Sequence, residues 1–263
     1  MGVVAALAAA VALAVSPVAY LQSHGAGGAF AEPGGTSDAL LTSWAVLGLR
    51  AAGATAPGSL AYLRSRESSL VASTDVSLIA LAEESLGYRN DALLARLGAK
   101  PSGQIGPTLN STVWAVLALG RSPAATTRFI LTHQARNGGF AWALGGQPDS
   151  NDTAAALEAL RVAHVRGPPV VRAVAFLRTF QNPDGGFELT RGRGSDAQST
   201  AWAIQGLVAA GVRPPRTAFA YLARLKRPDG SYRYSTRYAA TPVWVTSQVL
   251  AALAKKPFPL PRD

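Results

Sequence analysis

One short segment, residues 149–154, holds the residue types that proton-transfer chemistry requires. It reads Asp-Ser-Asn-Asp-Thr-Ala and stands at the start of a predicted helix. Neighbouring groups can make a carboxylic acid a strong proton donor, whereas an amide keeps its protons at ordinary pH. Asp152 and Asp149 are therefore the candidate catalytic residues. The structural alternative is that Asp152 caps the helix, because a carboxylate there satisfies unpaired N–H groups.

Tryptophan recurs at a similar depth in the predicted apolar helices. Trp44, Trp114 and Trp202 each lie about one turn into such a helix, so the three rings should lie in one layer. Together with Trp244 they form either the wall of a ligand pocket or ordinary core packing. Tyr238, in the last long turn, is placed to fold over the opening of such a pocket.

Composition excludes several kinds of chemistry. The 263 residues include no cysteine, which removes thiolate nucleophiles and Cys-ligated zinc. The three histidines, His24, His133 and His164, show no ligand spacing, so we expect no zinc, no other metal and no cofactor. The net charge of +10 favours an anionic partner or a membrane surface. No nucleic-acid motif accompanies the basic residues, so a nucleic-acid partner is not expected.

The chain repeats one plan six times. Each copy opens with an aromatic-Leu pair or its equivalent, continues through a glycine turn in the clear copies, and then enters an apolar helix. The opening helices are amphipathic, as around Phe176-Leu177, whereas the second helices are apolar nearly all round, as around Trp202. Units that repeat at this length stack on one another to bury their faces. The sequence therefore predicts an all-α fold, an α/α ring of about six outer–inner helix pairs, closed or nearly closed.

The repeats resemble those of the prenyltransferase and squalene-cyclase group. The resemblance rests on Gln181-Asn182-Pro183-Asp184-Gly185-Gly186-Phe187 followed by Ser199-Thr200-Ala201-Trp202, and on a second copy at residues 129–140. It implies an α/α toroid with the helices that follow each glycine turn on the inside. Fold alone does not assign a function, so each chemistry of the group is tested on its residues.

Two activities of the resembled group fit this sequence poorly. Protein prenyltransferases hold zinc through Asp, Cys and His, and this chain has no cysteine. Protonation-initiated terpene cyclases carry an Asp-x-Asp-Asp-Thr-Ala signature whose third position is the proton donor. Here that position is Asn151, so the chain is similar to a terpene cyclase that lacks the catalytic acid. Asp152 is the residue that would have to replace it.

In a toroid the inner helices run parallel, so their amino ends gather at one mouth. Polar residues open these helices and should ring the mouth, with the tryptophans below them. The candidate ligand-binding residues are Asp38, Asn110, Asn151, Asp152, Asp196, Trp44, Trp114, Trp202, Trp244 and Tyr238.

The amino end predicts export. Residues 3–15 are all apolar and Ala12-Leu13-Ala14 supplies a small-x-small cleavage pattern, although no Lys or Arg precedes the run. We expect residues 1–14 to be a signal peptide, residues 15–263 to be a single toroid domain, and the protein to be secreted or extracytoplasmic. A buried first helix is the alternative.

These patterns favour a binding module over an enzyme. The hypothesis is a toroid that holds a small hydrophobic, amphipathic or corrinoid-like ligand, or a partner, in its centre without catalysis. A membrane-associated partner is also considered. The alternative is a terpene (squalene-type) cyclase that uses Asp152, and a third possibility is an interaction protein with a filled centre.

Overall fold

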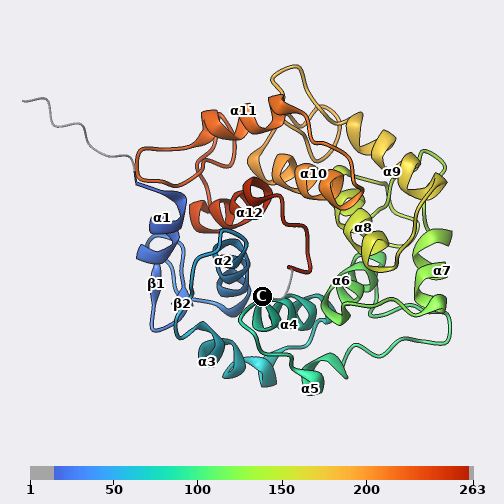
Figure 1. Cartoon of the computed structure of the whole chain (residues 1–263), viewed down its shortest axis with the longest axis horizontal. Helices are drawn as coiled ribbons and strands as arrows, with labels where there is room; N and C mark the ends of the chain where they lie inside the picture. Colours follow the sequence, from blue (N-terminus) through green and yellow to red (C-terminus); the bar gives the residue numbers. More distant parts are fainter. Residues whose placement is uncertain (1–14, 261–263) are drawn as a thin grey trace, which may run out of the picture.

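The computed structural model describes residues 15–260, which form two concentric rings of helices (Figure 1). The inner ring consists of α2 (Ala39–Ala51), α4 (Ser73–Ser85), α6 (Leu109–Leu119), α8 (Ser150–Val162), α10 (Ala197–Ala209) and α12 (Pro242–Ala254). The outer ring consists of α1 (Pro17–Ser23), α3 (Ser59–Arg64), α5 (Asp91–Leu94), α7 (Ala124–Thr132), α9 (Pro168–Arg178) and α11 (Arg216–Leu225). The predicted α/α toroid of six helix pairs is confirmed.

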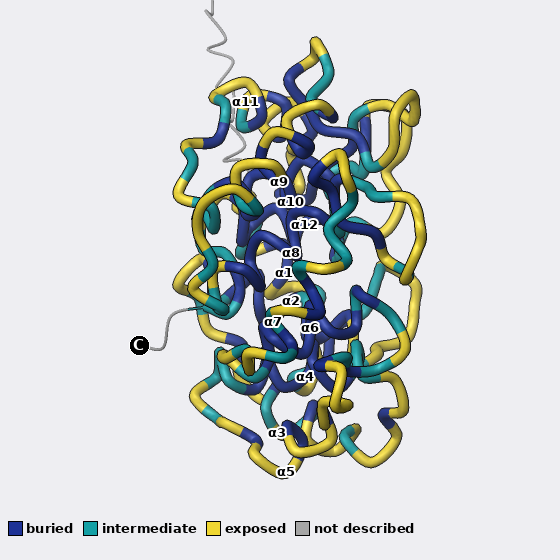
Figure 2. The backbone as a smooth tube through the Cα atoms, turned by 90° about the vertical axis from the view of Figure 1, so that its right-hand side faces the viewer, coloured by how far each residue is buried: buried dark blue, intermediate teal, exposed yellow. Residues whose placement is uncertain are grey.

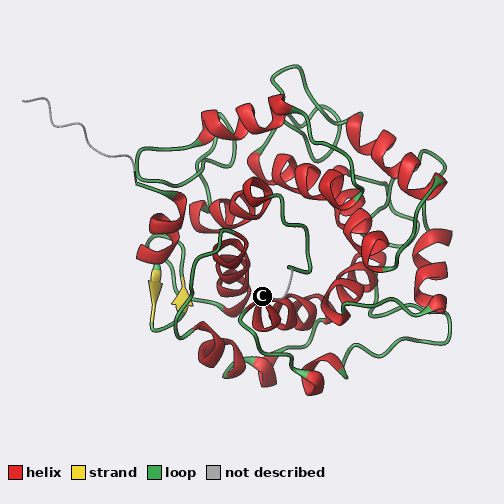
Figure 3. Ribbon diagram, viewed as in Figure 1, coloured by secondary structure: helices red, strands yellow, loops and turns green. Residues whose placement is uncertain are grey.

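Other regular structure is scarce in the described part of the chain. A single hairpin pairs β1 (Gly25–Ala26) with β2 (Ala29–Phe30), and one 3₁₀ turn, η1, spans Glu67–Ser69 (Figure 3). No helix within residues 15–260 has the length and apolar character needed to cross a bilayer. The predicted signal peptide, residues 1–14, lies outside the described residues.

Burial separates the two rings as the apolar patterns predict (Figure 2). Helix α10 is buried along nearly its whole length, because its neighbours α8 and α12 cover it on both sides. Helix α11 instead buries one face, through Ala218, Tyr221, Leu222 and Leu225, and leaves its arginines outside. An amphipathic stripe is sufficient for an outer helix, whereas an inner helix is packed on most sides.

A repeated threonine ties the glycine turns to the inner helices. In five of the six pairs its hydroxyl accepts a hydrogen bond from the backbone N–H just after the turn, at 2.9–3.0 Å. The pairs are Phe30–Thr42, Ile105–Thr112, Phe140–Thr153, Phe187–Thr200 and Tyr232–Thr246. This bond fixes the register of each inner helix, so residues at equal distances from these threonines lie at similar depths in the ring.

The ring closes between its first and last inner helices, α2 and α12. Gly48 allows their backbones to touch, since a Cβ there would lie 2.5 Å from the carbonyl oxygen of Ser247. The outer ring closes in the same way, because the turn at Gly230, with φ +90°, packs directly on the backbone of Ser16 at the start of α1. Both contacts require glycine, and together they make the toroid continuous.

Candidate functional site

The centre of the toroid holds a cavity of about 370 Å³ at the amino ends of the inner helices. Its lining comprises Trp44, Asn110, Trp114, Trp142, Asp149, Asn151, Asp152, Ala155, Leu189, Gln198, Trp202, Trp244 and Gln248. All five tryptophans of the chain are in this set. The structure therefore brings together seven of the ten predicted ligand-binding residues, and both candidate acids, around one space.

Three tryptophans form the aromatic layer that their spacing predicts. The ring centroids of Trp44, Trp114 and Trp202 lie 5.6–6.0 Å apart, and each pair meets edge to face. Each tryptophan follows its repeated threonine by two positions, so the common register explains the layer. Edge-to-face packing is the favoured geometry of such rings and makes the layer rigid.

The indole layer is incomplete on the side of α8 and α12. In α8 the position two residues after the threonine is Ala155, and in α12 it is Gln248. Alanine leaves room beside α8 that an indole fills in α2, α6 and α10. Ala155 carries no chemistry of its own, which explains why the sequence did not single it out as a site residue.

Asp152 lies directly above that gap, one turn before Ala155 on α8. The cap of α8 is Asp149 and not Asp152, so the capping interpretation of Asp152 is wrong: Asp149 Oδ1 accepts the N–H of Asp152 at 2.8 Å. The Asp152 side chain is free to face the cavity, where its Oδ1 accepts a hydrogen bond of 2.7 Å from Asn110 Nδ2.

Burial and the neighbouring acid keep Asp152 protonated. Desolvation, followed by the charge of Asp149 and hydrogen bonding to it, raises the pKa of Asp152 to about 8, while the Asn110 amide acts in the opposite direction. Asp152 is thus a neutral carboxylic acid below that pH. The carboxyl group of Asp152 therefore carries a proton at the cavity wall, and it is a weak acid.

The C-terminal segment that follows α12 lies inside the ring of inner helices (Figure 1). Phe258 is 1% exposed, and its ring centroid lies 6.1 Å from that of Trp44 and 6.3 Å from that of Trp202. Its N–H donates to Glu158 Oε1 at 3.1 Å, and its carbonyl accepts from Arg161 Nη2 at 2.7 Å. This segment carries no periodic pattern, so its place in the ring was not predicted from the sequence.

Three predicted ligand-binding residues lie outside the central cavity. Asp38 is exposed and caps α2. Asp196 caps α10, where burial raises its pKa, and lines a second cavity of about 910 Å³ at the mouth together with Tyr238. That mouth cavity shares Gln198 and Trp244 with the central one, so the two adjoin.

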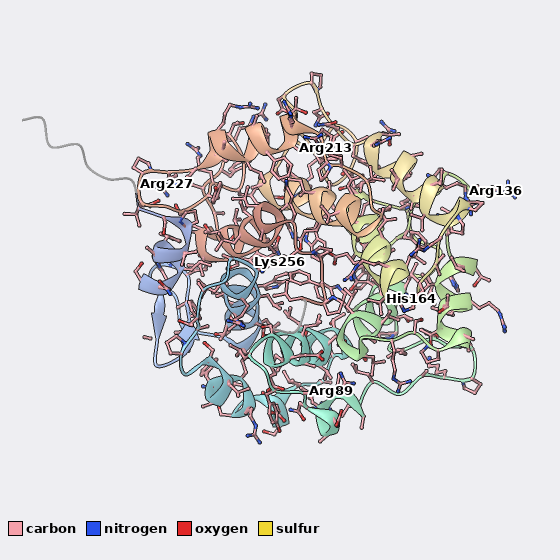
Figure 4. All side chains as sticks on the ribbon, viewed as in Figure 1. Arg89, Arg136, His164, Arg213, Arg227 and Lys256 are labelled. Carbon is pink, nitrogen blue, oxygen red and sulfur yellow. The ribbon has the colours of Figure 1, made fainter. Side chains whose placement is uncertain are left out.

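Basic residues are missing from the lining of the central cavity. Arg89, Arg136 and Arg227 lie at the periphery of the rings (Figure 4). Within residues 15–260 no group of three or more His, Asp and Glu side chains has the geometry to hold a metal ion. The site is therefore aromatic and acidic, in a chain whose net charge is +10.

No family model and no curated protein matches the sequence. Solved structures do match in fold. An ent-copalyl diphosphate synthase from Streptomyces platensis superposes with a TM-score of 0.59 at 20% identity, over 82% of this chain and 50% of that one. A type II terpene cyclase from Scytonema in complex with geranylgeranyl dihydroxybenzoate gives a TM-score of 0.64 at 16% identity, over 91% and 95%.

A third match is protein geranylgeranyltransferase-I from Candida albicans complexed with GGPP, with a TM-score of 0.61 at 14% identity over 82% and 83% of the two chains. Terpene cyclases and a prenyltransferase are thus structural neighbours, and the toroid fold expected from the resemblance is shown. The chain spans half the length of the copalyl diphosphate synthase.

Proposed function

We propose that this chain is a binding protein that holds a small apolar or amphipathic molecule in its central tryptophan cavity without transforming it. The observation that carries the proposal is the central cavity of about 370 Å³, which is lined by all five tryptophans and by the small side chain of Ala155. An apolar cavity with a few polar groups at its edge is the usual form of a small-molecule site.

The acid at the cavity wall supports binding over catalysis. Protonating an alkene demands a strong acid, and a pKa of about 8 makes Asp152 a weaker one than an ordinary carboxylic acid. Asn151, at the position where the resembled cyclases carry their donor, is an amide that lines the same cavity. Neither group is suited to starting a carbocation reaction.

Cavity size bears on the ligand class. A corrinoid-like macrocycle exceeds the central cavity, so it would also have to occupy the mouth cavity lined by Tyr234 and Tyr238. A compact ligand fits the central cavity alone. We therefore place small molecules ahead of corrinoids.

Filling the gap tests the proposal. Ala155→Trp would complete the indole layer and abolish binding of small apolar ligands such as geraniol, measured by calorimetry. Val171→Trp adds the same side chain on α9, where the native residue is 65% exposed, and should leave binding unchanged. Equal affinity in wild type and Ala155→Trp, or no binding to any of a panel of apolar and amphipathic ligands, would overturn the proposal.

A second candidate is a cyclase that uses Asp152, favoured by its neutral carboxyl directly above the aromatic layer. In that reaction the Asp152 O–H proton would pass to an alkene carbon, leaving a carbocation beside the indoles. Purified protein would then convert a polyprenyl substrate, Asp152→Asn would abolish turnover, and Asn151→Ala would preserve it. Product analysis that finds unchanged substrate rules this candidate out.

We also propose that the protein works outside the cytoplasm, on the basis of the apolar run at residues 3–15. Amino-terminal sequencing of protein from the cells that make it should find a start near Val15. An intact Met1 would contradict export.

A further inference from the structure

The lining of the central cavity has an unusual charge balance for this chain. It includes every tryptophan and two aspartates, yet none of the chain's 25 lysines and arginines and none of its histidines. Acidic groups without a basic partner offer no counter-charge to a carboxylate or phosphate ligand, so such ligands are disfavoured in a poorly solvated site. A purely apolar ligand, in turn, would leave the acids unused.

Indole rings and carboxylates are both attractive to positive charge. The face of an indole carries the negative part of its quadrupole, and several such faces around one space recognise ammonium groups. An organic cation is largely apolar at its surface, so it gives up its surrounding water at little cost. Aromatic walls can take the place of that water. The cavity therefore offers both halves of an organic-cation site.

The position of Asp152 agrees with a site for an organic cation. Asp152 and Ala155 lie three positions apart on α8 and so project from one face, which places the carboxyl directly over the gap. Asn110 Nδ2 donates to Oδ1 of Asp152 at 2.7 Å and holds the side chain in place. Asp149 caps α8 and offsets the partial positive charge at its amino end.

We propose that the ligand of this cavity is a small organic cation, a quaternary or tertiary ammonium compound, whose charged group lies in the gap beside Ala155 among the indoles and below Asp152. The inference rests on the proposed binding function and adds the chemical class of the ligand. Asp152 is the residue that selects for charge, and the tryptophans select for an apolar surface around it.

Binding of a cation should be coupled to the protonation of Asp152, and the pH dependence of affinity measures this coupling. A bound cation favours the ionised form of Asp152, whose pKa burial and Asp149 raise to about 8 in the free protein. The groups that face it from α6, α10 and α12 are uncharged: Asn110, Gln198 and Gln248. Binding should therefore release a proton, and affinity should rise with pH until about pH 8 and level off above it.

The test compares choline with 3,3-dimethylbutan-1-ol, which has the same shape but carries carbon in place of the charged nitrogen. Calorimetry of the full chain should show choline binding about tenfold more tightly, a difference of about 1.4 kcal/mol. The preference should grow between pH 6 and pH 8. Asp152→Asn should remove both the preference and its pH dependence, whereas Val171→Trp should change neither.

The outcomes separate the two proposals. Equal binding of choline and its neutral counterpart, or binding of geraniol without choline, overturns the organic-cation inference and leaves the binding function standing. Absence of binding by all three probes counts against both. Choline binding that survives Ala155→Trp would place the cation elsewhere and overturn the inference.

Discussion

Asn110 Nδ2 donates a hydrogen bond of 2.7 Å to Asp152 Oδ1, linking α6 to α8 at the rim of the central cavity. The two residues are 42 positions apart and belong to successive repeats. Asn110 thus holds the side chain of Asp152, a partly buried acid, in one orientation. The contact also lowers the pKa of Asp152, against the larger effects of burial and Asp149.

Asp149→Asn should lower the pKa of Asp152 from its value of about 8. Removing the neighbouring negative charge takes away the second-largest cause of the raised pKa, while asparagine still caps α8. Carbon-13 chemical shifts of the carboxyl group, followed against pH, measure the change. A pKa that stays the same or rises in the variant would show that Asp149 does not act on Asp152.

Stability should fall as pH rises because of Glu158. Burial is the main cause that raises the pKa of this fully buried group to about 8, against about 4.3 in the unfolded chain. Between these two pKa values Glu158 keeps its proton in the native state and loses it in the unfolded chain. Each unit of rising pH in this range therefore lowers the free energy of unfolding by about 1.4 kcal/mol. Urea unfolding at pH 5 to 8 tests this.

Glu158→Gln should flatten that pH dependence while keeping an oxygen to accept the N–H of Phe258. The residual slope should come from Asp152, Glu83 and Asp196, whose raised pKa values act in the same direction. Asp91→Asn, at a side chain that is 84% exposed, is the matched control and should leave the slope unchanged. A slope in Glu158→Gln equal to that of the wild type would show that Glu158 is ionised in the native state.

Gly48→Ala should open the junction between α2 and α12. The added methyl would lie 2.5 Å from the carbonyl oxygen of Ser247 and 2.8 Å from its Cα, so the two helices must separate. Overpacking of this kind costs about 1–3 kcal/mol. Gly98→Ala has no heavy atom within 4 Å of the new methyl and serves as the control. Equal denaturation midpoints for the two variants would contradict this account of ring closure.

We propose that exposed aromatic residues near the mouth contact a lipid surface. Trp142 is 58% exposed, and Tyr238 is also exposed, beside Arg193 and Arg237 of the mouth cavity. Aromatic and basic side chains together favour the interface of an anionic bilayer. The protein should float with vesicles containing phosphatidylglycerol, and the double variant Trp142→Ser/Tyr238→Ser should float less. Val171→Ser, which lies away from the mouth, should float as the wild type does. An equal loss of flotation in Val171→Ser and in the double variant would show that the mouth is not the membrane contact.

The sequence predicted those parts of the structure that repeat. Equal spacing from a common threonine sets the depth of Trp44, Trp114 and Trp202, so their layer follows from local pattern alone. Ala155 and Phe258 were missed for different reasons. Ala155 matters through the side chain it lacks, and Phe258 occupies the ring through contacts with residues about 100 positions away, which no local pattern encodes.

The aspartates at the helix starts also show which features a local pattern predicts and which depend on the whole fold. Asp38, Asp149 and Asp196 each accept the N–H of the residue three positions on, as expected of helix caps. Asp149 lines the central cavity whereas Asp38 and Asp196 do not, and only the folded structure distinguishes the three caps.

Native mass spectrometry of the protein purified from the cells that make it tests the binding function most directly. We expect one small molecule bound noncovalently per wild-type chain, lost on collisional activation, and absent from Ala155→Trp prepared in parallel. Val171→Trp should retain it. A wild-type protein that carries no ligand and binds none of the probes, or a ligand retained in full by Ala155→Trp, would contradict a central tryptophan cavity built to hold one.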